Sequence, residues 1–174
     1  MLFLLAPARG ENRYVGLTPR GARIEASVIA GASPASPTVL LISGLQGVDE
    51  SVKIVSEEAH KFAITKSSRR RFRLLSISLA NPEANRLMFP PGGVAYRDNL
   101  ESHALWRWIA MRAPDLVLIA GGEDFGLAEA LARDGPADVG PIPVRRVAAK
   151  PGFLHAVPEE IPPPMKLLGP RIDE

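Results

Sequence analysis

The stretch TVLLISGLQGVDES, Thr38–Ser51, decides the fold of this chain. It begins with an apolar run that contains β-branched residues, which is typical of a central strand covered on both faces. A turn marked by glycines follows, and from Asp49 to about Thr65 the apolar residues recur with helical spacing. Either Asp49 or Ser51 is expected to cap this helix. The stretch therefore predicts a buried strand, a tight turn and a helix that lies on the sheet.

The same kinds of pattern continue along the chain. Alternation of apolar and polar residues, or a short apolar run between turn residues, predicts three more strands, at Arg23–Ala30, Phe72–Leu79 and Leu116–Ala120. Apolar stripes at helical spacing predict helices at 100–109 and 124–133. Strands that alternate with helices at this spacing indicate an α/β fold of three layers, αβα. The central layer is a mixed, mostly parallel sheet.

Length and composition set the domain organisation. A chain of 174 residues with 46% apolar residues is long enough for one domain with a sizeable core. We expect residues 1–135 to form this domain. Nine of the 17 prolines lie beyond that point, where PVRRVAA and GFLHAV are candidate short strands within a region, 136–157, that completes the domain. Residues 158–174 are expected to be an extended or disordered tail.

Composition also excludes several kinds of chemistry and partner. The chain has no cysteine, which excludes disulfides, thiolate metal sites and a thiol nucleophile. Its net charge of +2 is small for its length and does not indicate a nucleic-acid partner. The apolar start is only about five residues long, too short for a signal sequence or a membrane span. We therefore expect a cytoplasmic protein that binds neither nucleic acid nor membranes.

Four segments, in order, are similar to segments of a known superfamily. They are VGLTPRGARIEA, TVLLISGLQGVDES, SLANPEANRLMFPP and NLESHALWRWIAMRAPDLVLIAGGED, and together they cover about residues 15–125. The chain resembles the zinc carboxypeptidase superfamily, in its succinylglutamate desuccinylase and aspartoacylase branch. The resemblance implies a carboxypeptidase-like α/β fold that is shortened at its C-terminal end. Independently, sites in mostly parallel sheets lie beyond the carboxyl ends of the strands, which places the candidate site in the loops 44–49, 80–93 and 121–124.

The resemblance implies a degenerate metal site. The zinc-ligand positions of the family fall on Gln46, Asp49 and about Gly121. An amide oxygen is a poor substitute for an imidazole at zinc, Asp is one methylene shorter than the family's Glu, and glycine has no side chain. We therefore expect no cofactor. The family's general base is a Glu on a late strand, and Glu159 or Glu160 matches it only loosely.

The substrate-binding positions are better preserved than the metal positions. Asn85 and Arg86 match the family's Asn-Arg pair, and Arg97 is a second candidate. A guanidinium at such a place can hold a carboxylate through two hydrogen bonds. Elsewhere, the basic run KSSRRRFR can contact phosphates, but its position at a helix-to-strand turn favours a solvated loop.

Three functions follow, and whether the chain is an enzyme stays open. We expect a pseudoenzyme or binding module whose partner is a small carboxylate-bearing ligand or a peptide. The alternative is a divergent metal-dependent carboxypeptidase or amidohydrolase that uses zinc on a peptide or an N-acyl amino acid. A replacement metal site would draw on groups at neighbouring strand ends, namely Asp49, Glu50, His103, Glu123 and Asp124. A second alternative is a structural subunit of a homo-oligomer, in which another copy covers an exposed sheet edge.

Overall fold

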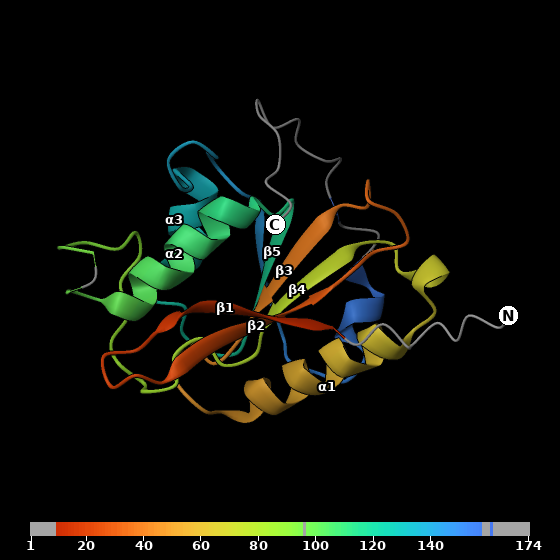
Figure 1. Ribbon diagram of the computed structural model, residues 1–174, viewed down its shortest axis with the longest axis horizontal. Coiled ribbons are helices and arrows are strands. Elements are labelled where there is room, and N and C mark those ends of the chain that lie inside the picture. The colour runs from red at the N-terminus through yellow and green to blue at the C-terminus, as the bar shows by residue number, and fades with distance from the viewer. Residues whose placement is uncertain (1–9, 96, 158–160, 162–174) are drawn as a thin grey trace, which may run out of the picture.

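The computed structural model describes residues 10–95, 97–157 and 161. They form a six-stranded sheet in the order β1-β2-β4-β3-β5-β6 (Figure 1). Strands β3 to β6 are parallel to one another, while β2 runs antiparallel to both of its neighbours, β1 and β4. The predicted mixed and mostly parallel sheet is confirmed. The strands are β1 (Glu11–Leu17), β2 (Arg23–Ile29), β3 (Thr38–Ile42), β4 (Arg73–Ile77), β5 (Leu116–Ala120) and β6 (Val144–Val147).

Strand β3 lies in the interior of the sheet, as its apolar sequence predicts. All five of its residues are buried. Leu40 pairs in parallel register with Leu75 of β4 and with Val117 of β5. Because both edges of β3 are hydrogen-bonded and both of its faces are covered, every position along it favours an apolar side chain.

Three helices cover the two faces of this sheet. They are α1 (Glu50–Ile64), α2 (Leu100–Arg112) and α3 (Leu127–Arg133). Figure 1 shows α1 on one side of the sheet, and α2 and α3 together on the other. Val55 of α1 belongs to a core cluster with Leu41, whereas Trp108 of α2 and Leu131 of α3 belong to a second cluster with Leu40. These two cores confirm the predicted three layers.

Strand β1 is not predicted by the sequence patterns. Of its seven residues only Val15 and Gly16 are buried, and its register with β2 shifts between Tyr14 and Gly16. A bulge in an edge strand interrupts the alternation by which a half-buried strand is recognised. Tertiary pairing with β2, and not local pattern, therefore makes this segment a strand.

The proline-rich region confirms one predicted strand and corrects the other. PVRRVAA contains β6, which pairs with β5. The prediction of a strand at GFLHAV is wrong, because Phe153–His155 form a short 3-10 helix, η2. Gly152 precedes it with a φ of 84°, and the N–H of His155 donates to the carbonyl of Gly152 at 3.1 Å. This turn buries Leu154 on the α1 side of the sheet without any strand partner.

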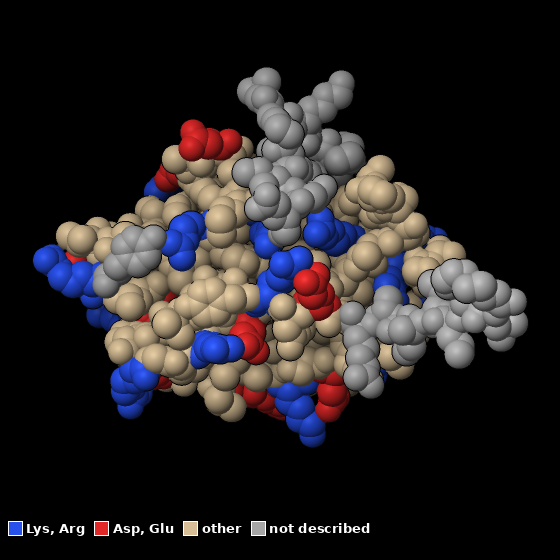
Figure 2. Space-filling model, in the orientation of Figure 1, with Lys and Arg blue, Asp and Glu red and all other residues tan. Residues whose placement is uncertain are grey.

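The net charge of the chain is small, and its charged side chains are dispersed on the face drawn in Figure 2. On the face drawn in Figure 2, Lys and Arg lie at several separate places, with Asp and Glu between them. Together with the net charge of +2, this leaves the field of the whole molecule weak, so a site for a charged ligand depends on local convergence of side chains. Among the helices of the described residues, none has the length and apolar character that crossing a bilayer requires.

Candidate functional site

The three predicted site loops meet at one edge of the sheet. The strands β3, β4 and β5 are parallel neighbours, so their carboxyl ends lie side by side. Asn81, beyond β4, donates from Nδ2 to the carbonyl of Leu45 at 2.8 Å. A Cβ atom added to Gly122, beyond β5, would lie only 2.3 Å from Oε1 of Gln46. The loops after β3, β4 and β5 therefore form one continuous surface.

Asp49 caps helix α1. Its Oδ1 atom accepts from the N–H of Ser51 at 2.8 Å and from that of Val52 at 3.3 Å, and it also accepts from the Ser51 hydroxyl. These N–H groups have no partner within the helix, so the carboxylate satisfies donors that would otherwise depend on water. This confirms one of the two predicted caps. It also gives Asp49 a structural role at the position where the family would hold a metal.

The other two positions that the resemblance assigns to zinc ligands, Gln46 and Gly121, offer no suitable donor. The side chain of Gln46 is exposed and lies against the backbone of Gly122. Gly121 has a φ of 116°, and a Cβ atom there would lie 2.9 Å from the hydroxyl oxygen of Ser51. A side chain at this position would therefore be strained and would displace Ser51. The residue before it, Ala120, is buried in the core.

These residues do not fit zinc. Zinc requires three or four imidazole, thiolate or carboxylate ligands, and the three positions supply one amide, one capping carboxylate and no third side chain. Within the described part of the chain, no three His, Asp or Glu side chains come together as a metal site. The replacement set does not assemble either: Asp124, for example, is 4% exposed and forms an ion pair with Arg146 at 2.7 Å. Glu159 and Glu160 lie outside the described residues.

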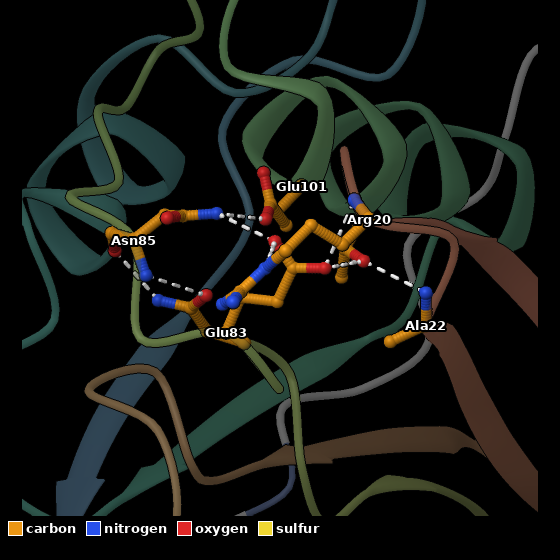
Figure 3. Close-up of polar contacts among 7 residues, drawn as sticks. Arg20, Ala22, Glu83, Asn85 and Glu101 are labelled. Atoms are coloured by element: carbon orange, nitrogen blue, oxygen red, sulfur yellow. Dashed lines mark hydrogen bonds and ion pairs between the residues drawn. The ribbon is translucent and has the colours of Figure 1, made fainter.

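Asn85, the first residue of the Asn-Arg pair, belongs to a partly buried polar network (Figure 3), whereas Arg86 is exposed beside it. Asn85 donates from Nδ2 to Glu101 at 2.7 Å and to Glu83 at 3.3 Å. Its backbone N–H and carbonyl are both hydrogen-bonded to the side chain of Asn81. The amide nitrogen of Asn85 is therefore engaged within the protein, where it holds the shape of the loop.

Glu83 is the centre of this network and is not identified by the sequence analysis. Its carboxylate accepts from the hydroxyl of Thr18 and from the backbone N–H of Arg20 at 3.0 Å, and it pairs with the Arg20 guanidinium at 3.2 Å. These donors, Thr18 first, and Asn85 hold the pKa of Glu83 below its usual value. The Glu83 side chain is 7% exposed. Because 65 residues separate Thr18 from Glu83, no local pattern could have paired them.

The two candidate arginines differ in their surroundings. Arg86 is exposed, next to Asn85 in the loop after β4, and no side chain of the described residues pairs with it. Arg97 is 74% exposed and pairs with Asp98 at 3.3 Å. It lies in the loop before α2, which projects away from the sheet in Figure 1. We call the turn at residues 44–49, between β3 and α1, the elbow. Arg86 is therefore the better placed of the two to bind an anion beside this elbow.

The fold is similar to that of solved metallo-carboxypeptidases. The metallo-carboxypeptidase from Burkholderia cenocepacia matches with a TM-score of 0.55 and 13% identity, over 68% of this chain and 38% of that one. Carboxypeptidase A from Helicoverpa armigera matches with a TM-score of 0.51 and 16% identity, over 67% of this chain and 42% of that one. The chain thus spans about two fifths of the length of these carboxypeptidases.

Another structure of similar fold matches over most of both chains. The murein-tripeptide amidase MpaA from Escherichia coli O157 has a TM-score of 0.50 and 16% identity, over 86% of this chain and 87% of that one. By sequence, the chain matches no protein-family model and no curated protein. At these identities the likeness defines the fold, and the chemistry has to be argued from this chain's own residues.

We predict that Asp49 stabilises the folded protein by capping the N-terminus of α1. Asp49→Ala removes the acceptor for two N–H groups of α1 and should lower the free energy of unfolding by about 1 kcal/mol. Asp49→Asn keeps a good capping acceptor and should cause a smaller loss. Urea unfolding at pH 7 measures both. Equal losses in the two variants would contradict a capping role.

We predict that Glu83 makes the protein more stable at neutral pH than in acid. Its folded-state pKa is lowered, so the unfolded state takes up the proton first as the pH falls below about 4.3. The stabilisation by Glu83 is therefore present above that pH and is lost as the pH falls through the folded-state pKa. Glu83→Gln should be less stable than wild type at pH 7, with a difference that shrinks towards pH 3 in urea unfolding.

A matched control for this variant is Glu57→Gln. Glu57 is exposed on α1 and lies 4.0 Å from Lys53, so its replacement should change stability little at any of these pH values. A gap between Glu83→Gln and wild type that stays constant from pH 7 to pH 3 would contradict the assigned role of Glu83.

Proposed function

We propose that this chain is a carboxypeptidase-like binding domain without hydrolytic zinc chemistry, and that its ligand carries a carboxylate. The observation that carries the proposal is the conformation at Gly121. Its positive φ would strain any other residue, and a Cβ atom there would press on the Ser51 hydroxyl, so both features oppose a third ligand at this position. The cap formed by Asp49 also supports the proposal, because its Oδ1 atom accepts from N–H groups of α1.

The loop after β4 supports the binding role. The side chain of Asn81 accepts from the backbone N–H of Asn85 and donates to the carbonyls of Asn85 and Leu45, and these three bonds hold the loop. Arg86 is the next residue and is exposed. A guanidinium on an ordered loop loses less freedom on binding a carboxylate than one on a mobile segment. The ligand class is therefore a peptide or an N-acyl amino acid with a free carboxylate.

An amidohydrolase is the second candidate. It is favoured by the match to the murein-tripeptide amidase, which extends over most of both chains. Zinc analysis of the purified chain after equilibration with excess zinc separates the two proposals. The binding-domain proposal expects much less than one zinc per chain. Stoichiometric zinc that is lost in Asp49→Asn would overturn it, because that variant keeps the cap and removes the carboxylate.

We predict that Arg86 recognises the carboxylate of the ligand. Calorimetric titration with a short N-acetylated peptide should show binding, and the same peptide with a C-terminal amide should bind at least about tenfold more weakly. Arg86→Gln should remove this preference, since the guanidinium supplies the charged hydrogen bonds.

The control for this prediction is Arg97→Gln. Because the Arg97 guanidinium is shared with Asp98, its replacement should weaken binding of the free peptide much less than Arg86→Gln does. Equal affinity of Arg86→Gln and wild type for the free peptide would reject Arg86 as the carboxylate-binding group.

A further inference from the structure

A cavity lies at the end of the parallel strands opposite to the loops 44–49, 80–93 and 121–124. It has a volume of about 390 Å³ and lies between the C-terminal end of α1, the 3-10 helix η1 (Ser67–Arg69) and η2. Because η1 precedes β4, this cavity is at the amino end of that strand, whereas the elbow loops follow the carboxyl ends. Its lining includes four basic side chains, namely Lys61, Arg69, Arg71 and His155.

The middle arginine of the basic run is structural. Arg70 is 4% exposed, and its guanidinium donates to the carbonyls of Ala30, Ala63 and Thr65. Two of these acceptors belong to the end of α1, where unpaired carbonyls carry the negative end of the helix dipole. Arg70 therefore compensates the negative charge of these carbonyls. As a result, the end of α1 does not repel an anion bound beside it.

The neighbours of Arg70 are available to a ligand. Arg69 and Arg71 are both exposed and line the cavity, and neither pairs with an acidic side chain in the described residues. Among the described residues that line the cavity, the only acid is Glu58, which accepts from Lys61 at 2.8 Å. With Glu58 and Lys61 compensating each other, the two arginines leave the cavity positively charged.

Glu58 stays ionised and paired in this cavity. Burial raises its pKa, but the hydrogen bonds from Lys61 and from the backbone of Gly152, with the charges of Lys61 and His155, outweigh burial and lower it. The Glu58 side chain is only 3% exposed. It therefore anchors Lys61 and η2 around the cavity and presents little negative surface to a ligand.

An aromatic surface adjoins these charges. Phe62 and Phe72 stack with their ring centres 4.7 Å apart and an angle of 23° between the rings. Phe72 is buried, while Phe62 is half-buried and lines the cavity. The cavity therefore combines an apolar wall with two guanidinium groups, and its volume suits a small molecule.

We propose that this cavity binds a small phosphate-bearing molecule with an aromatic or apolar part. Arg69 and Arg71 hold the phosphate, because a guanidinium matches phosphate oxygens through paired hydrogen bonds. The apolar part of the ligand packs against Phe62. The small net charge of +2 favours a small ligand over a nucleic acid, since a long polyanion requires an extended basic surface.

The test is to titrate the protein with phenyl phosphate and, separately, with inorganic phosphate, and to measure binding by calorimetry or NMR. Wild type should bind phenyl phosphate saturably and more tightly than inorganic phosphate. The double variant R69Q/R71Q should bind phenyl phosphate at least about tenfold more weakly. Both arginines are exposed, so an unchanged thermal unfolding curve should show that the fold is retained.

Two controls make the result specific. R13Q/R23Q removes the same charge from the β1–β2 hairpin, outside the cavity, and should bind phenyl phosphate within about twofold of wild type. Arg86→Gln should also leave this binding unchanged, which separates the cavity from the carboxylate site. Equal weakening in both double variants, absence of saturable binding, or preference for a single-stranded oligonucleotide over phenyl phosphate would overturn the proposal.

Discussion

The parallel pairing of β3 with β4 and with β5 is the constraint on which the rest of the molecule depends. It places the carboxyl ends of three strands at one edge, so that loops separated by tens of residues along the chain come into contact. The bond from Asn81 to Leu45, and the close approach of Gly122 to Gln46, are consequences of this register. A slip in the register would separate these groups, because each loop is held by its strand end.

The polar atoms at the turn between β3 and α1 bind the backbone. Asp49 stabilises the start of α1, and the Ser51 hydroxyl occupies the space beside Gly121. Each of these interactions supports the next, since the cap places Ser51 and Ser51 restricts position 121. The structure offers an ordered loop with an exposed arginine at the same edge.

Arginines define both proposed sites, and their roles depend on burial. In the run 69–71, the buried Arg70 satisfies carbonyls at the end of α1, while its exposed neighbours line a cavity. At the other end of the strands, Arg86 is exposed beside Asn85, whose hydrogen bonds hold the loop. In both places a buried polar contact orders the backbone, and an adjacent exposed guanidinium is left for a ligand.

The sequence by itself determined the elements whose signals are local. The apolar run at 38–43 and the helical stripe after Asp49 depend on neighbours in the chain, so β3, α1 and a cap at either Asp49 or Ser51 could be predicted. The tertiary structure decided the rest. β1 is a strand because β2 pairs with it, Glu83 is ordered by a threonine 65 residues away, and Arg70 differs from Arg69 only in where the fold buries it. These outcomes depend on contacts between distant segments, which local spacing does not encode.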